Sequence, residues 1–175
     1  MSSPKIRIME TTFGLFANQG YNSTGINQII AEANVAKASF YQHFKSKEDL
    51  CVAFLEARHI YWFNELHNFT DTEKDNRSKV IAAFDFVIHM NAKEGFRGCS
   101  FLNILSEIPN DNIKILSVIQ GHKQDLRNFF SALISDNILS DHVYMLFESS
   151  ITESKMFRSN ELIEKSKTII NNLIQ

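Results

Sequence analysis

Apolar residues recur along most of this chain at intervals of three and four positions, the spacing that lines one face of an α-helix. The first such stretch consists of Ile6, Met9, Phe13 and Phe16. Ser3 can cap this helix with Pro4 as its first residue, and Gly20 can end it. The pattern therefore predicts that the N-terminus forms a helix.

Two short helices are predicted to follow. Thr24 can cap the first of them, which contains Ile26, Ile29 and Ile30. Asn34 can then supply a left-handed turn residue, because asparagine tolerates that conformation better than most residues. The second short helix is predicted over about 36–43. Two short helices joined by a tight turn, with the first helix packed across them, make a helix-turn-helix unit.

The rest of the chain is predicted to be helical as well. Ser46 with Asp49 three residues later has the form of a helix cap, and the long helix that it starts contains Leu50, Phe54, Leu55 and Trp62. Further helices are predicted over about 76–93, 99–107, 112–134, 139–157 and 160–174. The expected fold is therefore all-α, with a helix-turn-helix domain at 1–47 and a larger helical domain at 48–175. Their boundary lies inside the long helix.

The distribution of charge agrees with this division. Residues 1–47 carry five basic and two acidic side chains, whereas residues 48–175 carry 13 basic and 18 acidic ones. A basic head on an acidic body suits contact between the head and phosphate. Two cysteines make no disulfide framework, and no apolar run approaches the length of a membrane span. We therefore expect a cytoplasmic protein with no membrane partner, and the absence of metal-ligand spacings predicts no metal and no cofactor.

The second short helix has the chemistry that DNA recognition requires. Residues 33–47 contain no carboxylate, and a helix that enters the major groove needs exposed donors and acceptors without repelling acids. Gln42 can make the bidentate contact that suits adenine, and Lys37 can reach guanine or a phosphate. The predicted DNA-binding residues are Thr24, Lys37, Ala38, Ser39, Tyr41, Gln42, His43, Lys45 and Lys47. The alternative is a solvated face, with Tyr41 as a half-buried ring and His43 as a surface residue.

The stretch LFANQGYNSTGINQIIAEANVAKASFYQHFKSKEDL, residues 15–50, resembles the DNA-binding domain of the tetracycline-repressor (TetR/AcrR) family of bacterial transcription regulators. The matching motifs include F-x-x-x-G-Y and V-x-K-x-x-F-Y-x-H-F-x-S-K-E-x-L. By this resemblance, Tyr41 and Lys45 would bind phosphate, and Lys37, Ser39 and Gln42 would face base edges. Phe40 and Phe44 would belong to the core.

Three residues depart from the family pattern. Ala36 replaces the serine or threonine that often caps the recognition helix, and Asn34 and Ala38 occupy positions where glycine is common. These departures affect the details of base contact rather than the fold.

The resemblance further implies that the C-terminal domain is helical, binds a small-molecule effector and forms a homodimer. The last two predicted helices would make half of a four-helix dimer interface, which a reader of a palindromic operator needs. Their apolar residues are Val143, Leu146, Phe147, Ile151, Leu162, Ile163, Ile169, Ile170 and Leu173. The alternative for these residues is an ordinary core.

An effector pocket is predicted between the long middle helices, where apolar and aromatic residues are frequent. The predicted ligand-binding residues are Trp62, Phe86, His89, Met90, Cys99, Phe101 and Asn103. Because the chain contains 15 phenylalanines, each of these side chains has a core position as its alternative.

Cys99 also supports a separate hypothesis. It shares a helix face with Asn103 and Glu107, and a thiol near a helix N-terminus and beside Arg97 has its thiolate favoured. Cys99 would then be a thiol switch for oxidants or electrophiles. The alternative is a small buried packing residue, the commoner position of cysteine.

The leading functional hypothesis is a ligand-responsive, sequence-specific DNA-binding regulator, a repressor released from its operator when the effector binds. An enzyme is the rival from another class, but no zinc-protease, nucleophile-elbow or phosphate-binding motif is present in the sequence. A third possibility is a helix-turn-helix protein that contacts another protein instead of DNA.

Overall fold

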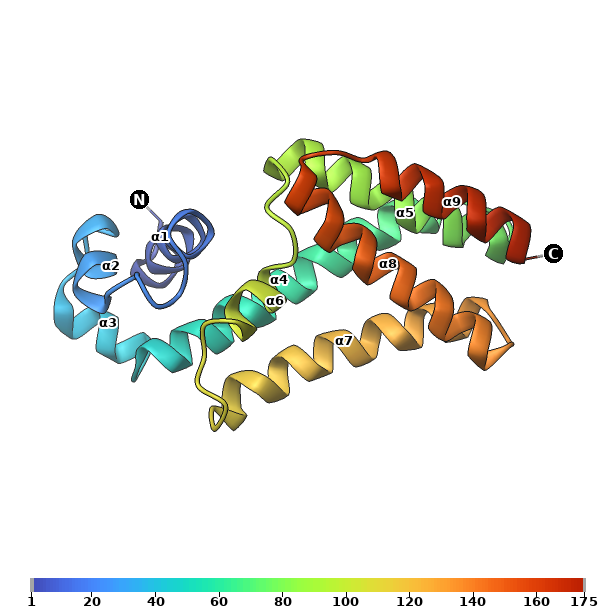
Figure 1. Cartoon of the computed structure of the whole chain (residues 1–175). Coiled ribbons are helices and arrows are strands. Elements are labelled where there is room, and N and C mark those ends of the chain that lie inside the picture. The colour runs from blue at the N-terminus through green and yellow to red at the C-terminus, as the bar shows by residue number, and fades with distance from the viewer. Residues whose placement is uncertain (1, 175) are drawn as a thin grey trace. The chain divides into compact units, whose positions relative to one another are not determined.

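The computed structural model describes residues 2–174, and within that range it contains nine α-helices and no strand (Figure 1). The all-α prediction is confirmed. The helices are α1 (Pro4–Asn18), α2 (Ile26–Glu32), α3 (Lys37–His43), α4 (Lys47–Thr70), α5 (Asn76–Glu94), α6 (Ser100–Leu105), α7 (Ile113–Leu133), α8 (Asn137–Phe157) and α9 (Glu161–Leu173). None of these helices combines the length and the apolar character that crossing a membrane would require.

Local capping chemistry sets several of these boundaries. The Ser3 hydroxyl accepts a hydrogen bond from the Ile6 N–H at 3.4 Å, and the Ser46 hydroxyl accepts one from the Asp49 N–H at 3.0 Å. Asn34 has a φ of 50°, the left-handed conformation predicted for the turn between α2 and α3. The sequence therefore correctly located the starts of α1 and α4 and this turn.

The predicted cap of α2 is wrong. Gly25 precedes the helix and makes no side-chain capping bond. The hydroxyl of Thr24 instead donates to the carbonyl oxygen of Gly20 at 2.6 Å, and the residue is fully buried. Thr24 closes the turn between α1 and α2, one residue before the position that a helix cap occupies.

The described residues form two compact units. The N-terminal unit comprises the chain up to His59 together with Ser100–Gln120, and the C-terminal unit comprises Ile60–Cys99 and the chain from Gly121 onward. Helices α4 and α7 therefore contribute to both units, and α6 belongs to the N-terminal one. The predicted domain boundary at residues 47 and 48 also falls within α4, but it does not anticipate that residues 100–120 join the N-terminal unit.

The N-terminal unit has a core of its own, in which α1, α2, α3 and the start of α4 meet. Ile8, Ile29, Phe40 and Leu50 have no exposed surface. Phe44 is 4% exposed, so the core positions implied for Phe40 and Phe44 are confirmed. Their burial fixes which side of α3 faces inward and leaves the opposite side to solvent.

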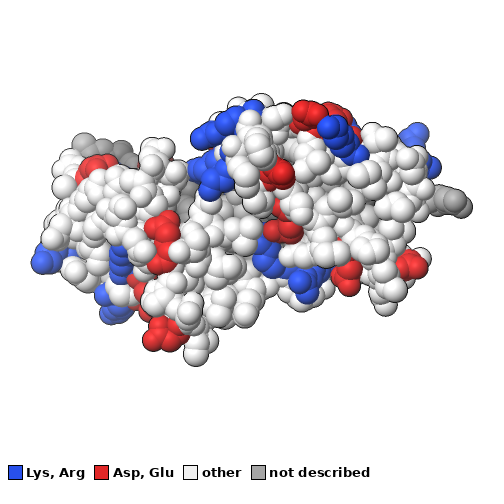
Figure 2. Space-filling model, viewed as in Figure 1, with Lys and Arg blue, Asp and Glu red and all other residues white. Residues whose placement is uncertain are grey.

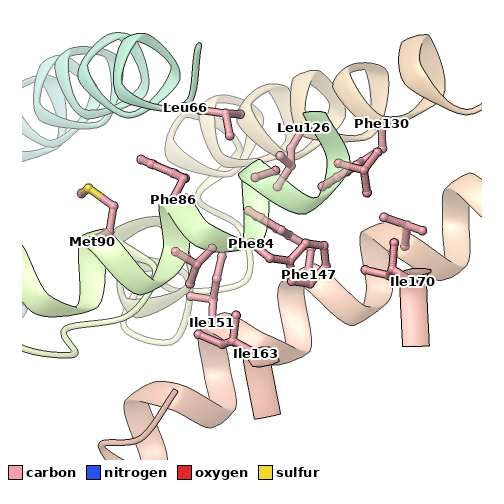
Figure 3. Close-up of a cluster of buried hydrophobic side chains, with 14 of the residues drawn as sticks. Leu66, Phe84, Phe86, Met90, Leu126, Phe130, Phe147, Ile151, Ile163 and Ile170 are labelled. Carbon is pink, nitrogen blue, oxygen red and sulfur yellow. The ribbon is translucent and has the colours of Figure 1, made fainter. Parts of the chain in front are cut away.

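The C-terminal unit is built around phenylalanines from α5, α7 and α8 (Figure 3). The Phe147 ring lies 5.3 Å from that of Phe84 and 5.2 Å from that of Phe130, measured between centroids. Helix α9 adds Ile163 and Ile170, which are fully buried. Part of the apolar stripe of the last two helices is thus core, as the alternative interpretation held.

Replacing Ser46 with alanine is expected to lower the free energy of unfolding by about 1 kcal/mol, because the Asp49 N–H loses its acceptor at the start of α4. Urea unfolding followed by circular dichroism measures the change. Ser131→Ala is the matched control, since that hydroxyl only donates to the Asn128 carbonyl within α7. Equal losses in the two variants would contradict the capping role.

Candidate nucleic-acid interface

The turn between α2 and α3 is held by a side chain from α1. The guanidinium of Arg7 donates from Nε to the Ala33 carbonyl and from Nη2 to the Asn34 carbonyl, both at 3.1 Å, and from Nη1 to the Ser2 carbonyl at 2.9 Å. The contacts to Ala33 and Asn34 satisfy carbonyls that the end of α2 leaves without helical partners. Arg7 therefore fixes the angle between the two helices of the helix-turn-helix unit. In the sequence, Arg7 counted only as one of the five basic residues of positions 1–47.

The outward side of α3 carries most of the predicted DNA-binding residues. Lys37, Ala38, Tyr41, Gln42, His43 and Lys45 are exposed, and Ser39 is half-buried. Lys37 and Tyr41 are four residues apart and lie on one side of the helix, with Ala38 and Gln42 beside them, and Lys45 follows the end of α3. The Tyr41 ring is 40% exposed and packs edge-on against Phe40, with 5.3 Å between centroids. Its hydroxyl is thus carried on a ring that the core orients.

This face has no acidic side chain of its own. Figure 2 shows basic atoms over α3, and both basic and acidic atoms near the start of α4, whose first turn contains Glu48 and Asp49. Glu32, the nearest acid before the turn, accepts a hydrogen bond from the Gln28 amide at 2.9 Å and stays on α2. A polyanion approaching α3 would therefore meet ammonium, hydroxyl and amide groups rather than carboxylates.

Thr24 and Lys47 are less available than predicted. Thr24 is fully buried and offers no surface to a phosphate in this conformation. The ammonium of Lys47 lies 4.3 Å from the centroid of the Tyr21 ring and donates to the Asn22 carbonyl at 3.4 Å. Partial burial lowers the pKa of Lys47, while nearby Glu107 acts in the opposite direction. Lys47 thus contacts the turn between α1 and α2 while remaining partly exposed.

The same turn is bound by a residue 85 positions away in the sequence. The Asn22 N–H donates to Oε2 of Glu107 at 2.6 Å, and the Asn22 side-chain amide donates to the Glu107 carbonyl at 2.7 Å. Gly20 has a φ of +89°, and a Cβ added there would come within 2.8 Å of the Glu107 carboxylate. Glu107 had been noted only for sharing a helix face with Cys99, so sequence reasoning missed this contact.

Comparison with known proteins identifies the family. Residues 8–54 match the family model described as bacterial regulatory proteins of the tetR family. Residues 8–54 therefore form a DNA-binding domain of the tetR family. TetR-family transcriptional regulators are ligand-responsive, DNA-binding repressors that act as dimers.

Two curated relatives are similar in sequence to this chain. The HTH-type transcriptional regulator YerO of Bacillus subtilis is 37% identical over 79 residues, a match that covers 45% of this chain and only 26% of that protein. An HTH-type transcriptional regulator of Staphylococcus aureus is 23% identical over 164 residues, covering 94% of this chain and 78% of the relative.

Solved structures resemble the chain over nearly its whole length. A TetR-family transcriptional regulator from Streptomyces coelicolor has a TM-score of 0.88 at 23% identity, with 97% of this chain and 93% of that chain covered. Reduced NemR from Escherichia coli has a TM-score of 0.84 at 20% identity, with 99% and 98% covered. At these identities the similarity establishes the fold shared by the three proteins.

The predicted effector residues are divided between the two units. Phe101 and Asn103 belong to the N-terminal unit, and Trp62, Phe86, His89, Met90 and Cys99 belong to the C-terminal unit. Phe86 is fully buried, Met90 is 7% exposed, and the Trp62 and Phe86 rings pack edge-on with 4.9 Å between centroids. These three side chains fill the core, and their role as ligand contacts stays a prediction.

Cys99 lies beside a lysine that is already paired. Lys123 Nζ is 3.5 Å from the Cys99 sulfur and 2.6 Å from Oε1 of Glu148. Arg97, the neighbour invoked for the thiol switch, forms an ion pair with Glu94 at 3.2 Å. The thiol switch therefore stays a hypothesis, with Lys123 as the cation that contacts the sulfur.

Glu107→Ala is expected to lower the free energy of unfolding by about 1 kcal/mol, because the Asn22 N–H loses its carboxylate partner. Since both residues hold one turn, the losses from Glu107→Ala and Asn22→Ala should deviate from additivity by about 0.5 kcal/mol or more. A double-mutant cycle by urea unfolding measures the deviation.

Lys114→Ala combined with Asn22→Ala is the control cycle. Lys114 pairs with Asp49 rather than with Asn22, so these two losses should add. Additive losses in the Glu107 cycle as well would show that Glu107 and Asn22 do not act as one unit.

The two thiols are expected to differ in reactivity. Burial raises the pKa of Cys51 to about 12, whereas Cys99 is partly exposed. Ellman's reagent at about pH 8 should modify Cys99 in the native protein and Cys51 only after unfolding. Absorbance of the released thiol, with intact mass spectrometry on Cys99→Ser and Cys51→Ser, tests this. Rapid modification of native Cys99→Ser would contradict it.

Proposed function

We propose that this chain is a dimeric repressor that binds a palindromic operator through α3 and releases it when a small molecule binds the C-terminal unit. The observation that carries the proposal is the exposed, acid-free side of α3 on a helix pair that Arg7 fixes. A protein with this target works in the cytoplasm, where bacterial DNA lies.

The exposed residues of α3 and of the turn after it fall into two groups, according to whether their side chains would reach the bases or the phosphates of DNA. Gln42 and Lys37 are the proposed base readers, because an amide suits adenine and an ammonium suits guanine. Tyr41 and Lys45 are the proposed phosphate contacts, since a hydroxyl and an ammonium at the edge of the helix can reach the backbone. Ala38 leaves room for the groove wall and can touch a thymine methyl.

Dimerisation is proposed through α8 and α9. Both helices keep large apolar side chains exposed on the isolated chain: Met145, Met156, Phe157, Leu162, Ile169 and Leu173. Ile163 and Ile170 face the core, so α9 is apolar on two sides. Burying the second side against a symmetric copy would give the four-helix arrangement that a two-fold operator requires.

The proposed response to effector uses the helices that the two units share. Both α4 and α7 continue from one unit into the other, so a change in the C-terminal unit can reach the N-terminal one without a flexible linker. In a dimer, a shift of α4 would alter the spacing of the two recognition helices, which has to match about 34–36 Å between half-sites.

DNA binding is tested by fluorescence anisotropy on the fragment upstream of the protein's own gene, with a scrambled duplex as control, across a salt series. Gln42→Ala is expected to weaken specific binding by about 1–3 kcal/mol and to relax preference at one base pair. Lys45→Ala should weaken binding to all sequences and reduce the salt slope by about 1.

Lys74→Ala is the matched control for Lys45→Ala, because Lys74 is an exposed lysine between α4 and α5. It should leave both affinity and salt slope unchanged. If the α3 variants bind as the wild type does, or if native and scrambled DNA bind equally in every variant, α3 is not the recognition helix.

A further inference from the structure

A cleft of about 340 Å³ lies within the C-terminal unit, and none of the predicted effector residues lines it. Its walls come from the last turns of α4, the start of α5 and the last turns of α7. The volume falls in the range of small-molecule sites, which begins at about 300 Å³.

Two helices each present one continuous face to this cleft. On α4, Phe63, His67 and Thr70 follow one another at intervals of four and three residues, and on α7, Asp125, Phe129 and Leu133 follow at intervals of four. The His67 ring lies between the two phenylalanines, 6.2 Å from Phe63 and 6.1 Å from Phe129 between centroids. The cleft thus has an aromatic wall contributed by both helices.

A buried hydroxyl without a partner lies in the lining. Thr70 is 1% exposed, and its Oγ1 makes no hydrogen bond. A helical threonine can usually bond to the carbonyl one turn earlier, and a buried hydroxyl left unpaired is unfavourable. A ligand that offered a polar hydrogen to this oxygen would remove that cost.

The charges around the cleft favour a cation. Asp71 and Asp125 contribute two carboxylates and Lys79 contributes one ammonium, while Nδ1 of His67 lies 3.8 Å from the Asp71 carboxylate. In addition, α4 ends at Thr70 and α7 ends at Leu133, so the negative ends of two helix dipoles lie at the cleft. Aromatic faces add a further attraction for positive charge.

We propose that this cleft binds a protonated arylalkylamine, with the ring against Phe63 and Phe129 and the ammonium near Asp125 and the Thr70 hydroxyl. Each part of the ligand then has a counterpart among the lining side chains. Only the assignment of this ligand as the effector rests on the proposed function, because binding itself can be measured without DNA.

The single tryptophan gives the cleft a built-in reporter. Trp62 is the only tryptophan in the sequence, and its ring packs edge-on against Phe63 with 5.3 Å between centroids. Titration with 2-phenylethylamine, which is protonated at neutral pH, should change the tryptophan fluorescence saturably. Neutral 2-phenylethanol and anionic 3-phenylpropionate should bind at least about fivefold more weakly, a difference of about 1 kcal/mol.

Variants separate the ammonium site from general effects. Asp125→Asn should weaken binding of 2-phenylethylamine by about fivefold or more, since one carboxylate is lost. Asp141→Asn is the matched control, because it makes the same charge change on an exposed part of α8 in the same unit. Thr70→Val should weaken binding yet raise the urea midpoint of unfolding, because the unpaired hydroxyl disappears. A purely structural role for Thr70 would not produce these opposite effects.

Three results would overturn the proposal: no saturable change at millimolar amine, equal binding of the amine and 3-phenylpropionate, or equal weakening by Asp125→Asn and Asp141→Asn. The operator assay distinguishes this failure from failure of the proposed function. Specific DNA binding without amine binding would contradict only the proposed amine site. Amine binding without specific DNA binding would contradict the proposed repressor function and leave the amine site supported.

Discussion

The recognition surface depends on one guanidinium. Arg7 binds the carbonyls of Ala33 and Asn34, and so holds the end of α2 and the left-handed turn residue against α1. Without these bonds, the turn would leave carbonyls unpaired, and the direction of α3 would rest on the packing of Phe40 and Phe44 alone. The exposed face of α3 is therefore set by a residue that itself belongs to the supporting helix α1.

A second constraint acts on the opposite side of α2. Asn22 donates twice to Glu107 and accepts a hydrogen bond from Lys47 through its carbonyl, so one residue is held between a carboxylate and an ammonium. Both ends of α2 are thus fixed by side chains from other helices or their flanking turns. A short helix has little stability of its own, and such external contacts allow it to form.

Local signals made much of this structure predictable. Ser3, Ser46 and Asn34 act within three or four residues of their own positions, and the spacing of apolar residues identified every helix described between residues 2 and 174. The site was less accessible to sequence reasoning. Arg7 reaches 26 and 27 residues along the chain and Glu107 reaches 85, so no local pattern indicates their partners. The sequence position of Lys47 likewise does not reveal that its ammonium lies over the Tyr21 ring, and its contact with DNA stays a prediction.

The Glu107 contact has a consequence for building hybrid regulators. A chimera that joins residues 1–59 to the body of another regulator would carry the recognition helix and Asn22 but leave behind the carboxylate that Asn22 binds and Lys114, the partner of Asp49. The transferable module is discontinuous, since it has to include residues 100–120. A hybrid that exchanges DNA specificity and keeps the connection between the two units therefore needs two grafted segments rather than one. These segments would be joined to the new C-terminal unit through α4 and α7.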